Sequence, residues 1–405
     1  MNKKRYCPLC EKYKPNVLKT LEFAQVENEI LPSKYRVVSC RNCGFVYDDV
    51  EVGPDVFLRH YAVSEKYVQR GIGGSGDISI VDSKRYNGIF NFVRWALKCT
   101  EIGIADVGCG KGGLLRFLKK RGYSNVFGFD PSPSCVDIIS KEYGIPAVCA
   151  GITDIARYKR RFGLVFVSNV FEHLFTVHDA VEAIDAILED DGFVYVDVPD
   201  GSRYYQWFYA PYYSFDKEHI NHFNVSAMTS LWAQHGYECI RAEELVGTPV
   251  SGRHIPMCRF LFQRLHAKRH RRDCIIGLSE GIHKFIEQSE VAEAKLALQR
   301  IPANSYYWGC GAYAKWLLNR FSEGTLGNPV AIVDAGTNGK SSITNRAGAE
   351  FPLIMPSLFE EHVDKTQTMV ITSVLYERQI FANLRENGWL GPVYSGASGR
   401  RKRWL

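Results

Sequence analysis

Two stretches of the chain join a short apolar run to a glycine-rich turn and a helical pattern. In the first, Ile104–Val107 predict a buried parallel strand, the glycines of residues 108–113 a tight turn, and residues 114–121 a helix. In the second, residues 306–316 repeat this order, and residues 330–334 predict the next strand, which ends in an acid. Because strands that alternate with helices pair in parallel, both stretches are expected to have an α/β fold.

The chain is expected to divide into three domains. Residues 1–56 carry two cysteine pairs, residues 57–245 contain the first strand, turn and helix pattern, and residues 246–405 contain the second. The third domain begins with a basic stretch, roughly residues 256–300, that we expect to be helical. Its charges would hold a pyrophosphate or form an ordinary solvated helix face; they belong to Arg264, Lys268, Arg269, Arg271 and Arg272.

The residues around the first glycine turn describe a site for a nucleotide-type ligand. Gly108 and Gly110 allow the tight turn, and Asp130 lies about one βα unit later, where a carboxylate accepts hydrogen bonds from both hydroxyls of a ribose. The glycine spacing also fits a dinucleotide fingerprint, so spacing alone does not name the ligand. Asp106 favours a methionine-derived cofactor over a dinucleotide, because it would repel a pyrophosphate and attract the ammonium group of such a cofactor. We therefore expect S-adenosylmethionine.

With these residues the chain resembles the class I S-adenosylmethionine-dependent methyltransferases, whose first motif is an acidic residue followed by G-x-G-x-G. The likeness covers roughly residues 100–245 and includes residues 162–174, which look like the fourth strand of that family and the turn after it. It implies a Rossmann-like methyltransferase core in which Asn169 helps to bind the cofactor. Many members hold the adenine amine with an acid after the third strand; here Asp154 is the candidate substitute.

Two C-x-x-C pairs near the N-terminus predict a metal site. Cys7 and Cys10 form one pair, Cys40 and Cys43 the other, and each pair can present two thiolates to one tetrahedral ion. Four sulfur ligands favour zinc over an iron site or a redox dithiol pair. Because four cysteines leave no open position for catalysis, the predicted role of the zinc is to fold a segment too small to bury a core of its own.

The candidate catalytic residues follow an aromatic-rich segment after the fifth expected strand. A proton acceptor that works near neutral pH is best supplied by histidine, and we assign this role to His219, with Glu218 to orient or charge-stabilise it. His222 and His173 are further candidates. The alternative is that the close histidines only cap and pack the helix expected at residues 226–235.

A tyrosine-bearing segment precedes the cofactor-binding residues. Phe57 and Tyr61 are four residues apart, as on one face of a helix, and predict either a lid over the substrate or ordinary packing. Tyr67 lies off that face and is the better candidate for contact with the substrate. The glycines of residues 71–76 then predict a flexible connection.

Taken together, these features resemble the three-domain C-methyltransferases that act on nucleotide-linked keto-deoxysugars. In that family a His-Glu-His triplet precedes a Tyr-Phe pair, and the last histidine of the triplet is the base. Its position here is taken by His219, while Lys217 replaces the first histidine, His222 the tyrosine of the pair, and Asp216 the tyrosine before the triplet. These departures also fit a broader group of polysaccharide-related methyltransferases. The resemblance implies a Rossmann-like C-terminal domain, with further strands near residues 352–356 and 369–373, that either binds a second nucleotide or is vestigial and borders the nucleotide-sugar pocket.

Composition sets the outer limits. With 405 residues, of which 46% are hydrophobic and 13% aromatic, the chain has ample material for packed cores. Neither a bilayer-spanning run nor an apolar signal segment is present, and the scattered cysteines are typical of reduced thiols, so we expect a cytoplasmic protein. The net charge of +6 is modest. It favours anionic small substrates and gives no indication of a nucleic-acid partner. The expected partner is a nucleotide sugar or glycan, with neither nucleic acid nor membrane, and we expect a monomer or homodimer.

Three functions are compatible with the sequence. The leading one is carbon methylation of a nucleotide-linked keto-sugar through an enolate, with S-adenosylmethionine as methyl donor and zinc in a structural role. In the second, the same base deprotonates a hydroxyl of a glycan or nucleotide sugar and the product is a methyl ether. In the third, the chain is a non-enzymatic partner protein that binds zinc and the cofactor.

Overall fold

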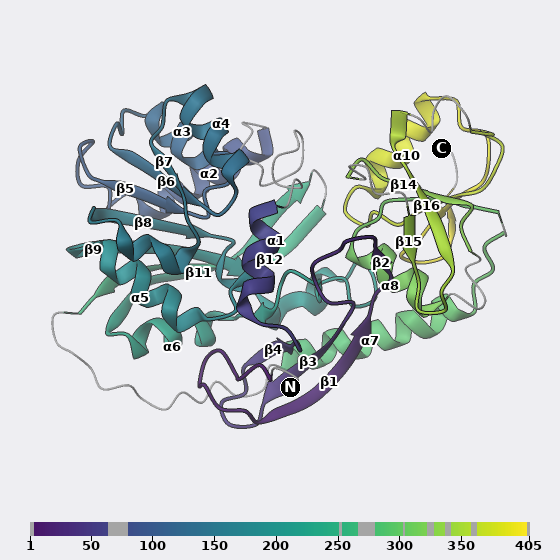
Figure 1. The fold of residues 1–405 in the computed structure, drawn as a ribbon, viewed down its shortest axis with the longest axis horizontal. Helices are drawn as coiled ribbons and strands as arrows, with labels where there is room; N and C mark the ends of the chain where they lie inside the picture. Colours follow the sequence, from purple (N-terminus) through teal and green to yellow (C-terminus); the bar gives the residue numbers. More distant parts are fainter. Residues whose placement is uncertain are drawn as a thin grey trace. The chain divides into compact units, whose positions relative to one another are not determined.

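The computed structural model describes residues 4–63, 80–250, 253–265, 280–302, 304–321, 328–336, 342–357 and 363–402. The chain forms two compact units, each assembled from separate stretches (Figure 1). Unit 1 contains residues 1–16, 38–204 and 218–279, and unit 2 contains residues 17–37, 205–217 and 280–405.

Unit 1 is built around a seven-stranded sheet with the order β11-β12-β9-β8-β5-β6-β7. Its strands are β5 (Ile104–Val107), β6 (Val126–Asp130), β7 (Ala147–Cys149), β8 (Phe162–Ser168), β9 (Leu188–Pro199), β11 (Tyr237–Val250) and β12 (Arg253–Arg264). β5 to β9 pair in parallel, whereas β12 runs antiparallel to both β9 and β11. In chain order the parallel strands are arranged 3-2-1-4-5, so the order reverses between β5 and β8. Sheets of this kind bind ligands at that point, beyond the carboxyl ends of the strands.

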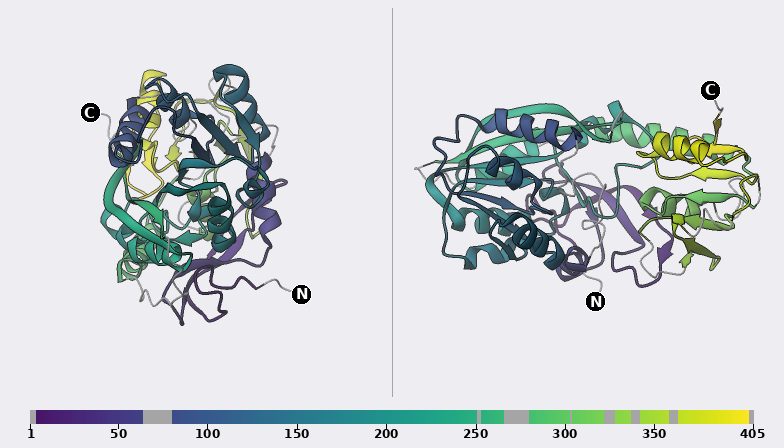
Figure 2. Two further views of the ribbon diagram at one scale, coloured as in Figure 1. Left: turned by 90° about the vertical axis from the view of Figure 1, so that its left-hand side faces the viewer. Right: turned by 90° about the horizontal axis from the view of Figure 1, so that it is seen from above.

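Helices cover both faces of this sheet (Figures 1 and 2). One face packs against α2 (Ile80–Val93), α3 (Gly113–Lys119) and α4 (Pro133–Tyr143), and the other against the short helix η2 (Ile152–Arg157), α5 (Val177–Ile187) and α6 (Val225–Gln234). Successive strand residues alternate between these two cores: Ile104 belongs to the first, and Ala105 belongs to the second. This alternation explains why the central strands are apolar throughout.

The cysteine-bearing N-terminal segment shares its core with the methyltransferase-like sheet. A four-stranded sheet has the order β1-β3-β4-β10, with β1 at Pro15–Glu22, β3 at Lys34–Cys40, β4 at Val46–Asp49 and β10 at Asn221–His222. Phe45 contacts Phe223, with ring centroids 5.0 Å apart, and both lie in the same buried cluster as the cysteines. Helix α1 (Pro54–Val63) follows β4, and the short helices η3 (Phe171–His173) and η4 (Gly201–Trp207) follow β8 and β9.

Unit 2 contains an eight-stranded sheet with the order β19-β18-β17-β13-β14-β16-β15-β2. Its strands are β2 (Gln25–Val26), β13 (Tyr306–Trp308), β14 (Ala331–Val333), β15 (Ser342–Thr344), β16 (Glu350–Ile354), β17 (Met369–Ile371), β18 (Val393–Ser395) and β19 (Arg401–Lys402), and its helices α7 (Glu280–Ala297), α8 (Ala312–Arg320) and α10 (Glu377–Glu386). The five central strands are parallel in the order 3-2-1-4-5. The strand, turn and helix predicted for residues 306–334 are therefore confirmed. Among the helices described in either unit, none combines the length and apolarity needed to span a bilayer.

The helix expected over the basic stretch is wrong for its first part. Residues 253–264 form β12, which pairs on both sides, with Phe260 opposite Val196 of β9 and Ala242 of β11. A run that is apolar on both faces suits a central strand, and its arginines were mistaken for a helical charge pattern. Residues 266–279 lie outside the described part of the chain, so the predicted pyrophosphate contact by Lys268, Arg269, Arg271 and Arg272 is not described by the structure.

Candidate functional site

The glycine turn after β5 lies against the loop that follows β8. Gly108 and Gly110 have left-handed backbones, with φ of +75° and +52°, which residues with a Cβ rarely adopt. The Gly108 N–H donates to the carbonyl oxygen of Phe129 at 2.8 Å. A Cβ on Gly108 would lie 2.5 Å from Cγ2 of Val170, in the loop that leads to His173. The turn therefore requires glycine, and it places the predicted cofactor residues beside the loop of a predicted catalytic histidine.

Asp130, at the end of β6, holds this turn with its carboxylate. Gly110 N–H donates to Oδ2 at 2.8 Å, and Ser132 N–H donates to Oδ1 at 2.9 Å. Burial raises the pKa of Asp130 to about 6, and the two N–H donors oppose the rise. An ionised carboxylate has about four lone-pair positions, so Asp130 retains the capacity to accept hydrogen bonds from a ribose.

Asp106 lies in β5 and is 4% exposed. Burial raises its pKa to about 8; Arg85 opposes this rise, whereas Asp130 and Asp197 add to it. The Arg85 guanidinium donates to the Ser168 hydroxyl at 2.6 Å, which in turn donates to Oδ1 of Asp197 at 2.6 Å. A buried acid that is mostly protonated at neutral pH is therefore present beside the turn, and a bound cation would favour its ionised form.

Replacing Asp106 by Asn should stabilise the ligand-free protein, and the gain should grow with pH. The folded pKa of about 8 exceeds the unfolded value of 3.8, so the folded state holds the proton more tightly and wild-type stability falls as pH rises between these values. Asn does not titrate. We expect the variant's advantage in free energy of unfolding to be about 3–4 kcal/mol larger at pH 8 than at pH 5.

Urea unfolding of both proteins at the two pH values measures this difference. The matched control is Asp137→Asn, because the Asp137 side chain is exposed and pairs with Lys141 one turn away; its effect should not depend on this pH range. An Asp106→Asn difference that stays constant from pH 5 to pH 8 would show that the Asp106 carboxyl is not held protonated.

The structure places the two remaining cofactor candidates after β7 and β8, which are consecutive in the chain and separated in the sheet by β5 and β6. Asn169 directly follows β8 with a left-handed φ of +51°, and its N–H donates to Oδ1 of Asp197 at 3.0 Å. Asp154 lies in η2, after β7, where its half-exposed carboxylate pairs with Arg157 at 3.1 Å. Contact of either side chain with the cofactor stays a prediction.

Two of the predicted histidines come together after the carboxyl end of β8. The rings of His173 and His219 meet edge to face, with centroids 4.7 Å apart and planes at 75°. Nδ1 of His173 lies 3.0 Å from the carbonyl oxygen of Glu218. The carboxylate of Glu172, which is 2% exposed, approaches Nε2 of His173 to 3.9 Å. His173, Glu218 and His219 thus share one site, and Glu172 joins them.

Helix α1 adds two side chains to this site. The Tyr61 hydroxyl lies 2.9 Å from Nδ1 of His173, and the two rings meet edge to face at 5.4 Å. Nε2 of His60 lies 3.6 Å from Oε1 of Glu218. The sequence pattern favoured packing for Tyr61 and pointed to Tyr67, which lies outside the described residues. Tyr61 follows the buried Phe57 by four residues, which is the spacing of ordinary helix packing. Nothing in the sequence shows that the hydroxyl of Tyr61 reaches a polar partner.

Arg5 joins the two histidine loops from within the core. Its guanidinium, on a residue 1% exposed, donates to the carbonyl oxygens of Ile220 (2.8 Å) and Leu174 (3.2 Å), the residues that follow the two site histidines. It also donates to the carbonyl of Asp48 (2.9 Å) and to Oδ1 of Asn221 (2.7 Å). Asn221 donates to the Leu174 carbonyl at 2.7 Å. Burial lowers the pKa of Arg5 to about 10, so the group remains charged at neutral pH.

Replacing Arg5 by Lys should destabilise the protein by about 2–4 kcal/mol. Lysine keeps the charge but lacks the planar fork that satisfies carbonyls in several directions, and buried carbonyls left without donors cost about 1–3 kcal/mol each. Denaturant unfolding measures the loss. The control is Arg41→Lys, since Arg41 is exposed and its guanidinium donates to Oδ1 of Asn16 at the surface; we expect a change within about 0.5 kcal/mol there. Equal effects of the two substitutions would contradict a clamp at Arg5.

His222 occupies a different environment from the other two histidines. It lies in β10, is 3% exposed, and has Nε2 3.2 Å from Oδ1 of Asp48. Its Nδ1 lies 3.5 Å from the hydroxyl of Tyr204. With both ring nitrogens facing protein groups, His222 is better suited to position the β10 segment than to exchange protons with a substrate.

Lys217, where the resembling family has its first histidine, belongs to an ion cluster of unit 2. Its ammonium lies 2.8 Å from Oε1 of Glu29, which also binds Lys315 at 2.7 Å. Burial lowers the pKa of Lys217. Burial alone would raise the pKa of Glu29, but the two lysines lower it to about 2. Lys217 is therefore held in a buried ion pair, away from any role as a proton acceptor.

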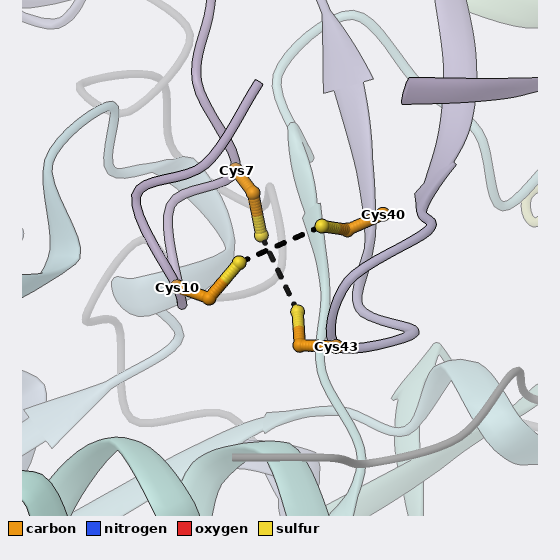
Figure 3. Close-up of side chains that lie close together, drawn as sticks. All are labelled: Cys7, Cys10, Cys40 and Cys43. Carbon is orange, nitrogen blue, oxygen red and sulfur yellow. Dashed lines mark hydrogen bonds between the residues drawn. The ribbon is translucent and has the colours of Figure 1, made fainter. Parts of the chain in front are cut away.

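The four N-terminal cysteines converge as predicted, although they come from two separate loops (Figure 3). All four sulfur atoms lie within 4.8 Å of one another, with Cys7 to Cys43 at 3.6 Å and Cys10 to Cys40 at 3.5 Å. Four sulfurs about 2.3 Å from a tetrahedral zinc ion would be about 3.8 Å apart. Gly44, with a φ of +86°, lets the second loop turn back so that its N–H donates to the Cys40 carbonyl at 2.8 Å. The donor set and its spacing fit a zinc ion.

Comparison with known proteins assigns the central part of the chain. Residues 98–242 match the family model described as a methyltransferase domain. The C-methyltransferase NovU of Streptomyces niveus is 25% identical over 212 residues, which cover 50% of this chain and 46% of NovU. The matched region thus spans about half the length of this curated relative.

The chain also has a low overall similarity to solved structures of other proteins. The magnesium protoporphyrin IX methyltransferase of Synechocystis, solved with S-adenosylmethionine, has a TM-score of 0.37 and 13% identity and covers 52% of this chain and 97% of its own. An S-adenosylmethionine-dependent methyltransferase of Mesorhizobium loti has a TM-score of 0.37 and 16% identity and covers 44% of this chain and 100% of its own. The family match and the strand order of the sheet show that the chain contains an S-adenosylmethionine-dependent methyltransferase domain with a Rossmann-like α/β fold.

Proposed function

We propose that the chain methylates a carbon next to the ketone of a nucleotide-linked keto-deoxysugar. The observation that carries this proposal is the contact between His173 and His219, 4.7 Å between ring centroids, in loops beside the glycine turn of the methyltransferase domain. A proton acceptor at that position is what a carbon or hydroxyl acceptor needs before it can attack a methyl group. The name of the relative NovU, a C-methyltransferase, favours carbon over oxygen.

The cofactor residues in this proposal are those around the switch point of the sheet. Asp130 would accept the ribose hydroxyls, and Asp106 would face the cationic methionine end; Asn169 and Asp154 would border the remainder of the cofactor. When bound, S-adenosylmethionine supplies an electrophilic methyl group on a sulfonium sulfur. The ionised form of Asp106 offsets that positive charge, which a protein interior would otherwise disfavour.

His219 would act as the base. In the ketone reaction it takes the proton from the carbon beside the carbonyl, the C–H electron pair moves into the enolate, and the carbon of the enolate then becomes the nucleophile. The second histidine, His173, is fixed by the carbonyl of Glu218 and by Tyr61, so it would orient the acceptor or stabilise its oxygen. Glu218, 3.6 Å from His60, would contribute negative charge near the imidazolium that forms. His222 and Tyr67 complete the predicted set, His222 as a positioning residue.

Four thiolates at the N-terminus would hold a structural zinc ion. The ligand atoms are Sγ of Cys7, Cys10, Cys40 and Cys43, and Cys7, Cys40 and Cys43 are buried. Thiolates packed this closely repel one another unless a cation lies between them. A closed site of this type stabilises the fold and takes no part in the chemistry.

A panel of nucleotide-linked keto-sugars with cofactor labelled in its methyl group tests the function. We expect label to enter one sugar, on a carbon next to the ketone, as shown by NMR of the product. If the label appears in a methyl ether, carbon methylation is refuted and the chain is an O-methyltransferase. Binding of the cofactor without transfer to any sugar or glycan would leave the non-enzymatic alternative.

A further inference from the structure

Glu172, His173 and His219 bring together three side chains of the kind that bind transition metals. One ligand atom from each lies within 4.8 Å of the other two. Glu172 and His173 are neighbours in η3, after β8, whereas His219 comes from the loop before β10, so the set is assembled by the fold. Two imidazole nitrogens and one carboxylate oxygen are the protein ligands of several zinc and non-haem iron sites.

The contacts at Nδ1 of His173 are compatible with metal binding at Nε2. The Tyr61 hydroxyl, 2.9 Å from Nδ1, can donate or accept and so fits either tautomer. The carbonyl oxygen of Glu218 can only accept, so its 3.0 Å contact with Nδ1 is a hydrogen bond when Nδ1 carries the proton. In that tautomer Nε2 has a lone pair, and Nε2 is the atom 3.9 Å from the Glu172 carboxylate. Metal-binding histidines usually donate their other N–H to a carbonyl or carboxylate in this way.

Charge and burial favour a cation at the same place. The Glu172 side chain is 2% exposed, and an anionic group in the interior gains from a nearby positive charge. His173 and His219 are half-buried, so both residues keep some contact with solvent. The mixed nitrogen and oxygen donors favour Zn²⁺ or Co²⁺ over Mg²⁺ and Ca²⁺, which prefer oxygen alone.

We infer that Glu172, His173 and His219 bind one divalent transition-metal ion, and that this ion inhibits the enzyme. The imidazole nitrogen that binds a metal cannot also accept a proton, so the ion and the acceptor substrate exclude each other. The binding half of this inference is independent of the reaction; the inhibitory half rests on the proposed function of His219.

The test adds Co²⁺ alone to protein whose cysteine site already holds Zn²⁺, with neither cofactor nor acceptor present. We expect one further equivalent to bind with weak d–d absorption and without the intense sulfur-to-metal band that thiolate ligands produce. Glu172→Gln and His219→Ala should each weaken this binding at least about a hundredfold, since even loss of an outer partner costs about 10–100-fold. His283→Ala, a histidine of α7 outside the cluster, should leave it unchanged.

Three results would overturn the inference: no second equivalent at millimolar Co²⁺, equal binding by wild type and Glu172→Gln, or a second equivalent whose spectrum shows thiolate ligation. In the reaction, Zn²⁺ should inhibit wild type competitively with the acceptor, and removal of the ion should restore activity. Metal binding without any methyl transfer would refute the proposed function and support the metal site. Methyl transfer without metal binding would support the proposed function and refute the metal site.

Discussion

His219→Ala should lower the turnover of methyl transfer by about a hundredfold or more, the loss expected when a general base is removed. Cofactor affinity should stay nearly unchanged, because the predicted cofactor residues lie in or just after β5, β6, β7 and β8 and not on the loop of His219. Single-turnover kinetics with labelled cofactor measures the rate, and calorimetry measures the dissociation constant. The rate of methyl transfer should therefore fall while the dissociation constant of the cofactor stays the same.

Proton exchange locates the base without the methyl donor. Wild-type enzyme in deuterated water should exchange the hydrogen next to the ketone of its substrate, and His219→Ala should not. The matched variant is His173→Ala, which removes the other ring of the pair but leaves the proposed base. Exchange that survives in His219→Ala and disappears in His173→Ala would identify His173 as the base. Exchange that survives in both variants and disappears in His222→Ala would identify His222 as the base.

Cys40→Ser should prevent unit 1 from folding stably at 25 °C. Structural zinc sites contribute about 10–16 kcal/mol of apparent binding free energy near pH 7, and that energy is folding energy. The effect should not stop at the N-terminus, because Cys40 lies in the same buried cluster as Phe171 and Phe223 of the methyltransferase domain. Metal analysis should find less than one zinc per chain, and near-ultraviolet circular dichroism should lose its tertiary signal.

Cys99→Ser provides the comparison, since Cys99 is exposed and far in sequence from the two C-x-x-C pairs. It should keep one zinc per chain and the wild-type spectrum. Full zinc occupancy in a variant that lacks Cys7, Cys10, Cys40 and Cys43 would show that the metal lies elsewhere. A stable, zinc-free wild-type protein would show that the four thiols need no ion.

The parts of the fold that follow from short-range pattern were predictable. The strand at Ile104–Val107 and the turn after it need only an apolar run and glycines with positive φ. The same holds for β13 and β14 in unit 2. Cysteine spacing predicted the four-thiol set, because each C-x-x-C pair presents two thiolates together and the loop between the pairs is long enough to bring them to one site.

Long-range contacts were not predictable from one sequence. Arg5 contacts residues more than 160 positions away, and nothing in its neighbourhood distinguishes it from an ordinary basic residue near a terminus. Glu172 was not among the candidates, and the sequence left Tyr61 between a lid and ordinary packing, because the roles of both depend on which loops the sheet brings together. β12 was missed because arginines flank its apolar residues, and local charge outweighed the apolar run in the prediction.

Unit 2 cannot be made as one continuous fragment, and this constrains how the protein is synthesised. Its sheet is completed by β2, where Val26 pairs with Ile343, and Tyr212 donates to Glu293 of α7 at 2.7 Å. During synthesis β2 therefore leaves the ribosome long before β15, the strand with which it pairs, has been made. Until then the unpaired edge must be kept from other chains. A nascent-chain experiment should find β2 open to protease until β15 has left the exit tunnel, whatever the state of unit 1.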